Sequence, residues 1–546
     1  MTTTTNRGYI IPDPGDPPAT YGTKWATLVT AQDVDIQNAL DNGYPLDSIV
    51  IVQHGDNDVA NGTNLLDAYT AAKALTPGGL PLGADNRALL IVPAGSYDLD
   101  GLQFQIDTDF IDIQGHGICR RIAGSSPGQM DANSVKLPST RIYGSAPIVL
   151  VGVSANDFNV KSIYIEQNSL GDAAVEVSES TGAPRSSWID FAYKLADLSP
   201  TAGFKPVSPA TKLAGYFEHC HCHWGFLWGE FDGVIKNSSA ADYSIGALTD
   251  ASGVGTFNGI AEDCAFAGNS VGFGDAGGIV GTSAVIRRCT VDVYCCGASD
   301  NTGAAAFNGL GEDIIASEAC FGHAEGGEGS ISGTLRRCVS TNVRSFAAGG
   351  SSGYGVIKTG AIIKDCEGDD YCFASEDGGS SSNSIETGSL LENCKGGANC
   401  FGGTAGSIRG KLINCETTNG FAGPNGTLST AELVNCRELE NGVGEADSLT
   451  VFRNFESLFR RNIMPNFAGK MYDSKIKTSL DSCVEVKNSN AHFYYCMFHA
   501  AGNSPLGTDS AYDVVLVHCT FDGVLDANFT NLVSTPYNVD SSAIEL

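Results

Sequence analysis

The sequence predicts an all-β fold in which short parallel strands stack in register as a solenoid. Three observations indicate this fold. A short motif recurs through the middle of the chain, apolar and charged residues alternate within the motif, and the composition has 67 glycines but only 5 methionines. A glycine-rich, methionine-poor chain favours turn-rich β structure over helix bundles.

The recurring motif ends in a cysteine or its equivalent. The spacing varies, from 18 residues between Cys220 and Ser238 to 31 between Cys289 and Cys320. Because the motif survives while the spacing changes, the motif is a core strand and the remainder is loop. The motifs, from GYFEHC to AELVNC, end at Cys220, Ser238, Cys264, Cys289, Cys320, Cys338, Cys366, Cys394, Cys415 and Cys436.

Aligning these motifs separates a buried face from an exposed one. Small residues five before the cysteine and apolar residues three before it mark the buried face of a strand. Charges whose signs nearly alternate stand two before it, which avoids repulsion between like charges on strands about 4.8 Å apart. A groove for a charged ligand is the alternative interpretation. The charged column comprises Glu218, Lys236, Glu262, Arg287, Glu318, Arg336, Lys364 and Glu392.

The residue just before the cysteine is expected to form a tight corner on every coil. Asparagine and aspartate tolerate left-handed backbone angles and recur at this position. They are Asn237, Asp263, Asp365, Asn393, Asn414 and Asn435. A second inward column, six residues beyond the cysteine, comprises Phe226, Cys295, Cys372, Cys400 and Phe421.

The stretch EHCHCHWGFLWGE, residues 218–230, suggests zinc because its cysteines and histidines are zinc ligands. A flat strand cannot wrap both of its faces around one ion, so the coil interpretation is preferred. It places His219 at the corner, Cys220 and Cys222 inside, and His221 and His223 outside. Neither a metal site nor a cofactor is expected.

The flanks of the repeat are less regular. Residues 87–117 and 139–169 alternate as short strands between glycines, and residues 64–75 have a helical period. Residues 444–470 are expected to form a helix or a long loop, before strands resume near Cys483, Cys496 and Cys519. The expected domains are 1–84, an attachment and cap region, 85–440, the solenoid, and 441–546, a C-terminal β region.

Two resemblances follow from these segments. VPAGSYDL and IDIQGHG, with the NC corners, resemble the right-handed parallel β-helix of the pectin-lyase-like fold over residues 87–440. NRGYIIPDPGDP and YGTKWATLV resemble the attachment regions of bacteriophage tailspikes and tail fibres. The second resemblance implies a virion protein, a homotrimer that joins other tail or capsid proteins through residues 1–84. Residues 441–546 would then form a receptor-binding or trimerisation tip.

Charge and targeting signals narrow the partners. The net charge of −30 disfavours nucleic acid and anionic membranes as partners. No apolar run approaches 18 residues, so no membrane insertion is expected. The start of the chain resembles no secretory signal, which fits a virion protein made in the host cytoplasm. The 18 cysteines are therefore expected to be reduced and buried.

The expected function is an adhesin that recognises host surface polysaccharide. Polysaccharide hydrolysis requires two carboxylates facing the sugar. The candidate carboxylates are Asp369, Asp370, Glu376 and Asp377, with Asp292 and Glu367. Because no arginine or lysine accompanies them, binding is preferred to cleavage. The alternatives are a virion depolymerase, acting as a lyase or a glycoside hydrolase, and a purely structural appendage.

Aromatic side chains supply the candidate sugar contacts. They are Trp224, Trp228, Tyr371 and Phe373. The alternative is that they shield the coil surface or a subunit interface. The glycine-rich AEGGEGS lacks the strand–helix context of a phosphate-binding loop.

Overall fold

The structure is a computed structural model that describes most of the chain. The described residues are 2–3, 10–11, 37, 39–122, 135–145, 147–167, 173–178, 183, 185–194, 202–206, 212–222, 225–241, 244–247, 254–294, 296–299, 303–350, 352–375, 383–403, 405–422, 425–439, 445–459, 467–478, 484–486, 491–500, 506–507, 513–522, 531–534 and 539–540.

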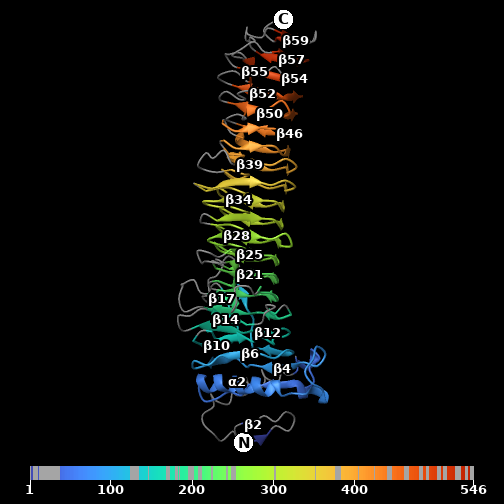
Figure 1. Cartoon of the computed structure of the whole chain (residues 1–546). Coiled ribbons are helices and arrows are strands. Elements are labelled where there is room, and N and C mark those ends of the chain that lie inside the picture. The colour runs from blue at the N-terminus through green and yellow to red at the C-terminus, as the bar shows by residue number, and fades with distance from the viewer. Residues whose placement is uncertain are drawn as a thin grey trace. The chain divides into compact units, whose positions relative to one another are not determined.

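The chain divides into two compact parts. The first comprises Met1–Ala123, Asp131–Asp197 and Gly215–His221, and the second comprises Gly124–Met130, Leu198–Ala214 and Cys222–Leu546. Each part is built mainly from short parallel strands that pair from coil to coil, which confirms the predicted all-β solenoid. Figure 1 shows these strands as successive arrows in each part.

The first part carries one long helix, α2 (Asp58–Lys73), which confirms the helical period seen in the sequence. Asn57 caps the helix by accepting the Ala60 N–H at 2.9 Å. Leu65, Tyr69 and Ala72 are buried on one face, so the helix covers apolar side chains of the coil. The other elements are β1 (Thr2–Thr3), β2 (Ile10–Ile11), η1 (Leu46–Ser48), β3 (Ile49–Ile51), η2 (Pro77–Gly79), β4 (Ala88–Ile91), β5 (Gly95–Asp98), β6 (Phe104–Ile106), β7 (Ile111–Gln114), β8 (Arg120–Arg121), β9 (Val135–Lys136), β10 (Thr140–Gly144), β11 (Val149–Val151), β12 (Asn159–Lys161), β13 (Tyr164–Gln167), β14 (Ala173–Val177), β15 (Ser187–Ile189), β16 (Ala192–Lys194) and β18 (Tyr216–Glu218).

In the second part each regular coil contributes to three parallel sheets. The first sheet contains β22 (Val234–Lys236), β26 (Ile260–Glu262), β29 (Val285–Arg287), β32 (Leu310–Glu312), β35 (Thr334–Arg336), β38 (Ile362–Lys364), β40 (Leu390–Glu392), β43 (Lys411–Ile413), β46 (Glu432–Val434), β49 (Val451–Arg453), β51 (Lys470–Tyr472), β54 (His492–Tyr494), β57 (Asp513–Val517) and β59 (Asn531–Ser534). The second contains β23 (Ser239–Ala240), β27 (Ala265–Phe266), β30 (Thr290–Val291), β33 (Ile315–Ala316) and β36 (Val339–Ser340), then β41 (Lys395–Phe401), β44 (Glu416–Phe421), β47 (Arg437–Glu438), β50 (Glu456–Phe459), β52 (Lys475–Thr478), β55 (Met497–Ala500), β58 (Thr520–Asp522) and β60 (Val539–Asp540).

The third sheet and the shorter pairings complete the coils. The third sheet contains β21 (Glu230–Phe231), β25 (Gly255–Phe257), β28 (Gly277–Val280), β31 (Ala304–Phe307), β34 (Glu328–Ile331), β37 (Tyr354–Ile357), β39 (Ser384–Ile385), β42 (Ser407–Ile408), β45 (Thr427–Leu428) and β48 (Glu445–Ala446). The remaining strands are β17 (Ala202–Pro206), β20 (Leu227–Trp228), β24 (Ile245–Ala247), β53 (Val484–Glu485) and β56 (Leu506–Gly507), with β19 (His221–Cys222) at the sequence boundary of the two parts.

The predicted corner is confirmed. Between the first and second sheets each coil turns at one residue with positive φ, and the side chains of these residues form a ladder. Asn414 donates to Asn393 at 2.9 Å and Asn435 donates to Asn414 at 3.0 Å. The corner residues are Asn237, Asp263, Arg288, Asp313, Arg337, Asp365, Asn393, Asn414, Asn435, Asn454, Asp473, Tyr495 and His518.

The motif alignment from the sequence is wrong for one coil, the one that contains Glu312. In the structure Glu312 pairs in register with Arg287 and Arg336, so Ile314 takes the position that was assigned to Cys320. Isoleucine fills the same inward site, so the motif persists there without its cysteine. Glu318 is therefore not a member of the charged column.

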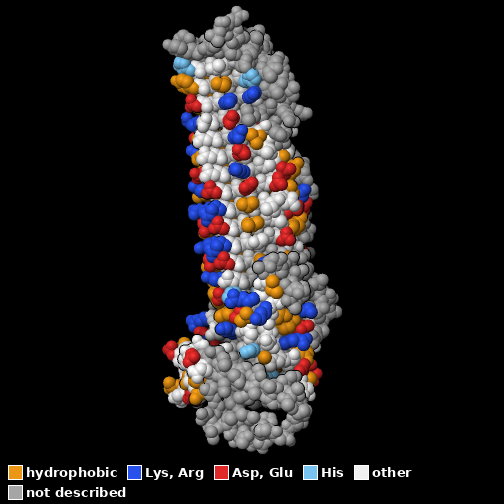
Figure 2. All heavy atoms as spheres, turned by 180° about the vertical axis from the view of Figure 1, so that it is seen from behind, with side chains coloured by type: hydrophobic (Ala, Val, Ile, Leu, Met, Phe, Trp, Pro, Cys, Tyr) orange, Lys and Arg blue, Asp and Glu red, His pale blue; other side chains and the backbone are white. Residues whose placement is uncertain are grey.

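With this correction the charged column is confirmed as an ion-pair ladder. Lys236 lies 3.0 Å from Glu262, Arg336 lies 3.5 Å from Glu312, and Lys364 lies 2.6 Å from Glu392. Figure 2 shows the resulting alternation of blue and red side chains along one edge of the second part. Exposed pairs of this kind contribute about 0.2–1 kcal/mol each, so the ladder sets the register more than the stability.

The interior is lined by cysteines and stacked phenylalanines. All described cysteines are free and buried. The Cys436 thiol donates to the Leu412 carbonyl at 3.4 Å. The Phe373 ring stacks between those of Phe346 and Phe401, with centroids 4.8 Å away on both sides. The expectation that Phe373 stacks on sugar is therefore wrong, because both faces of its ring are covered inside the coil.

The coils continue past Cys436, contrary to the expected helix or long loop after residue 444. Among the described residues, 445–459 form β48, β49 and β50 in register with the preceding coil. Phe455 and Ser474 are buried where earlier coils place cysteine, so a search for cysteines misses these coils. Cys295 and Cys483 lie outside the described residues. None of the helices in the described ranges is long and apolar enough to cross a membrane.

Candidate functional site

Asp369 and Asp370 lie in the turn that follows β38, and the structure brings their carboxylates together over Gly397. A Cβ on Gly397 would lie 3.0 Å from Asp369 Oδ1 and would overlap Asp370 Oδ1. Asp370 also accepts the N–H of Ala398 at 2.5 Å. Asp369 is exposed and Asp370 is half-buried. Glu376, Asp377 and Trp224 lie outside the described residues.

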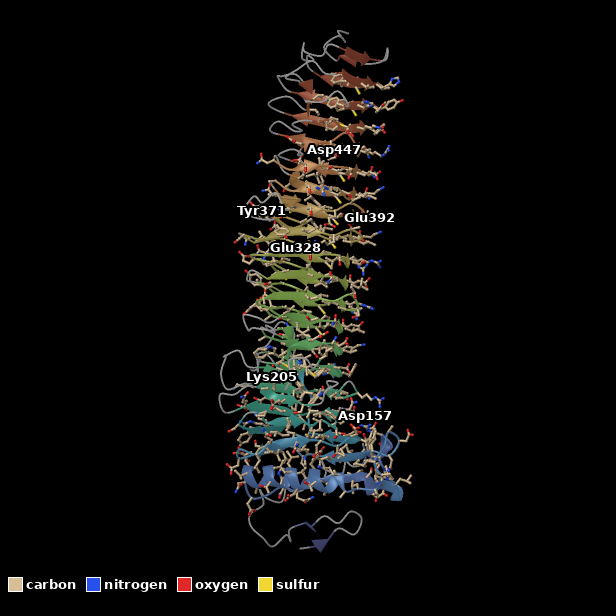
Figure 3. The ribbon with its side chains drawn as sticks, viewed as in Figure 1. Asp157, Lys205, Glu328, Tyr371, Glu392 and Asp447 are labelled. Atoms are coloured by element: carbon tan, nitrogen blue, oxygen red, sulfur yellow. The ribbon has the colours of Figure 1, made fainter. Side chains whose placement is uncertain are left out.

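Tyr371 belongs to a second column of left-handed residues, which we call the corner strip. Its members are Asn269, Tyr294, Ala319, Arg344, Tyr371, Asn399 and Gly420. They lie on successive coils, because the N–H of one member bonds to the carbonyl just before the next. The Arg344 N–H donates to Asp370 at 3.1 Å, and the Tyr371 N–H donates to Ala398 at 3.0 Å. In Figure 3, Tyr371 lies at the opposite edge of the ribbon from Glu392 of the ion-pair ladder.

The residue types on the corner strip are unexpected for its backbone. Asparagine and glycine adopt positive φ readily, whereas a bulkier residue pays about 1–2 kcal/mol. Tyr294, Arg344 and Tyr371 nevertheless have φ of 51°, 64° and 55°. All three are half-buried, and the Tyr294 ring contacts the buried rings of Phe273 and His323. Strain of this kind concentrates at functional sites.

A partly buried cluster of ionisable side chains adjoins the strip. The Glu325 carboxylate is 3.9 Å from the Arg344 guanidinium and 3.4 Å from Nε2 of His323. His323 is fully buried against the ring of Tyr294, with centroids 5.7 Å apart. Gly350 leaves the space that the Glu325 carboxylate occupies, because a Cβ there would overlap it.

This cluster is not predicted by the sequence pattern. AEGGEGS resembles only a candidate phosphate loop, and no arginine or lysine is near the candidate carboxylates in sequence. Arg344 is far from Asp370 in sequence, yet its backbone bonds to Asp370 on the next coil. The available signal was FGHAE, where a histidine and a glutamate two apart interrupt a run of small residues.

The remaining candidates are dispersed. Trp228 on β20 is half-buried, and the ammonium of Lys205 lies 5.6 Å from the centre of its ring. Trp228 is not a member of the corner strip. Asp292 is exposed and accepts a hydrogen bond from Ser317 on the next coil. Glu367 is exposed and bridges Val339 to Lys395 through its backbone.

The histidine–cysteine stretch is mostly interior. Cys220 and Cys222 are buried as expected, whereas His221 is buried instead of facing outward. Burial, with smaller effects from Arg121 and His219, lowers the pKa of His221 to about 4. The charge of Arg121 on β8 acts on His221, so β8 lies near this strand. His223 lies outside the described residues.

Burial of His221 predicts an acid-sensitive step in stability. Its pKa of about 4 in the folded chain lies below the ordinary value of 6.5. Below pH 6.5 the unfolded chain binds the proton first, so stability falls as the pH drops from 6.5 to 4. The loss approaches about 3 kcal/mol. Urea unfolding of the wild-type chain should therefore be more pH-dependent over this range than that of His221→Gln. Parallel profiles would contradict the assignment.

Comparisons with known proteins supply little further information. No family model matches the chain, and no curated protein matches it. Among solved structures, the Agl-KA catalytic domain aligns over 90% of this chain and 69% of its own at 13% identity, with a TM-score of 0.24. DFA-IIIase from Arthrobacter chlorophenolicus A6 aligns over 90% and 86% at 10% identity, with a TM-score of 0.16. Likenesses this weak carry no argument about function.

Proposed function

We propose that this chain recognises a polysaccharide along the corner strip and serves as a virion adhesin of the tailspike or tail-fibre kind. The observation that carries the proposal is the strip itself. Tyr294, Arg344 and Tyr371 keep strained left-handed backbones at a half-buried corner where asparagine or glycine suffices on three other coils. Strain that the fold does not require is consistent with selection for binding.

The geometry of the strip suits a linear sugar chain. Tyr294 and Tyr371 are three coil steps apart, about 14 Å at about 4.8 Å a step. A tyrosine offers an apolar ring and a hydroxyl, which match the two kinds of surface on a sugar. The exposed carboxylates of Asp292 and Asp369 border the strip and can accept hydrogen bonds from sugar hydroxyls.

The virion setting rests on the sequence resemblance. Attachment through residues 1–84 and assembly as a homotrimer belong to the same proposal. An adhesin of this kind displays its coil surface to the host. A binding site such as the corner strip, which runs along the outer side of consecutive coils, fits this role.

Binding to isolated host surface polysaccharide tests the proposal. Tyr371→Ala should weaken binding about tenfold, the loss of about 1.4 kcal/mol of contact energy. Tyr354→Ala is the matched control, because Tyr354 is a half-buried tyrosine on β37, outside the strip, that bonds to Glu328. It should change the affinity less than about twofold. Equal losses in both variants, or no binding by the wild-type chain, would contradict the proposal.

Cleavage of the bound polysaccharide is the second candidate, favoured by the cluster of Glu325, His323 and Arg344 beside the strip. The guanidinium of Arg344 lies 3.9 Å from the Glu325 carboxylate. A carboxylate suits the base or nucleophile of a hydrolase, and the sequence-predicted carboxylates that border the strip, Asp292 and Asp369, are its candidate partners. Reducing-end release that Glu325→Gln abolishes while binding persists would establish the enzyme. Binding without release would leave the adhesin.

A further inference from the structure

One coil near the C-terminal end of the second part carries three lysines without ion partners. Lys470, Lys475 and Lys477 are exposed, and no ion pair joins them to the described residues. Earlier in this part most cations on the coil surface are neutralised by a neighbouring coil, and Lys395 and Arg409 are single exposed exceptions. These paired cations are Lys236, Arg287, Arg288, Arg336, Arg337, Lys358, Lys364, Lys411, Arg437 and Arg453.

Strand register extends the three lysines into a surface. Lys470 pairs with His492 and Lys477 pairs with His499 on the following coil, while Lys475 pairs with Met497. Met471 and Ile476 alternate with the lysines and are buried, so the lysines point outward, Lys470 from the first sheet and the other two from the second, on either side of the Asp473 corner. We call this surface the basic face. It comprises Lys470, Lys475, Lys477, His492, Met497 and His499.

Aromatic side chains adjoin the basic face. The rings of Tyr472 and Tyr494 stack at 4.8 Å, and the Tyr494 hydroxyl lies 3.3 Å from Nδ1 of His492. Tyr495 is 58% exposed and stacks on His518 at 5.0 Å. Tyr495 occupies a left-handed corner where most coils carry asparagine, aspartate or arginine. Figure 2 shows pale-blue histidines beside orange and blue side chains at this end of the molecule's second part.

The basic face is a local concentration of positive charge in an acidic chain. The net charge is −30, yet this coil exposes three lysines. Only Lys475 has an acid in register on the preceding coil, Glu456, whose carboxylate lies 3.4 Å from Arg437. Lys475 and Lys477 are two apart on one side of β52, where like charges repel. An anionic ligand would remove this repulsion. At physiological salt charges act over about 8 Å, so most of the acidic body of the chain is screened from these lysines.

We infer that the basic face is a second binding site, for a carboxylate-bearing polysaccharide. A protein partner fits less well, because lysine is depleted in protein interfaces. Nucleic acid carries about one charge per 1.7 Å, which the acidic body of the chain opposes more strongly than a sparser polyanion. Lysines bind the carboxylates, and the exposed Tyr495 and Met497 contact the apolar faces of the sugars.

Polygalacturonate, with one carboxylate on each sugar, is the probe, and neutral dextran is the comparison ligand. Binding to the full-length chain is measured at low and at physiological salt. The triple variant Lys470→Gln, Lys475→Gln, Lys477→Gln should bind polygalacturonate at least about tenfold more weakly, with a shallower salt dependence. The control variant Lys236→Gln, Lys364→Gln, Lys411→Gln has the same net charge but replaces lysines that form ion pairs, and should bind within about twofold of wild type.

Other outcomes separate the alternatives. Equal weakening in both triple variants, or no binding of polygalacturonate by the wild-type chain, overturns the inference. The inference is also overturned if a DNA oligonucleotide of equal charge binds more tightly than polygalacturonate. The same holds if the triple substitution of Lys470, Lys475 and Lys477 dissociates an oligomer, as measured by sedimentation. The Tyr371→Ala variant should keep its affinity for polygalacturonate, so failure of the corner-strip proposal leaves this inference standing.

Discussion

Phe373→Ala should unfold at a much lower urea concentration than the wild-type chain. The Phe373 ring is fully buried and stacks on Phe346 and Phe401 with interplanar angles of 10° and 8°. Removing it loses the transfer energy of a large side chain and leaves a cavity that both flanking rings border. Such truncations cost about 3–5 kcal/mol.

The measurement is the urea midpoint and slope, followed by circular dichroism. Phe373→Leu is the graded control, because it keeps an apolar group and should lose clearly less than alanine. Tyr371→Ala, two residues away at the surface, should shift the midpoint by a smaller amount. If alanine at 373 and at 371 gave equal shifts, the internal stack would not be a principal source of stability.

Arg87→Gln should produce the second large loss, in the first part of the chain. The Arg87 guanidinium lies 2.6 Å from Asp112 and 2.7 Å from Asp157, and Asp112 is only 3% exposed. Burial alone would lower the pKa of Arg87, but the hydrogen bonds and charges of the two carboxylates raise it. Removing one partner leaves buried charge uncompensated, which costs about 3–5 kcal/mol.

The same substitution on the ion-pair ladder provides the control. Arg336 is 47% exposed and lies 3.5 Å from Glu312, so Arg336→Gln should cost no more than about 1 kcal/mol. Thermal unfolding of both variants in low and high salt separates the two cases. Salt should erase the small Arg336 effect and leave the Arg87 effect. Similar losses for both variants would show that burial does not govern these pairs.

The sequence predicted those features that one coil determines by itself. Asparagine and aspartate signal a left-handed corner locally, and Asn393 and Asn414 lie where that signal placed them. Cysteine identified the coils less reliably than the corner residues did, because the inward site requires only an apolar group. Ile314 and Phe455 fill it equally well, which displaced one coil and hid later ones.

The candidate site was only partly predictable for a related reason. Asp369, Asp370 and Tyr371 were found as neighbours in sequence. Glu325 and Arg344 come from different turns and meet only once the coils are stacked. Tyrosine and arginine carry no local signal for positive φ, so nothing in the sequence marked Tyr294 and Arg344 as corner residues.

The alternating charges at the corners affect how many coils can be inserted or deleted together. Asp263, Arg288, Asp313 and Arg337 alternate in sign, and Arg288 and Arg337 each form a salt bridge to the preceding aspartate. Deleting residues 289–313 would place Arg288 next to Arg337 and set two cations against each other. Deleting 289–337 would instead place Arg288 next to Asp365 and restore an opposite pair. In this stretch the unit of growth by duplication, or of loss by deletion, is therefore two coils.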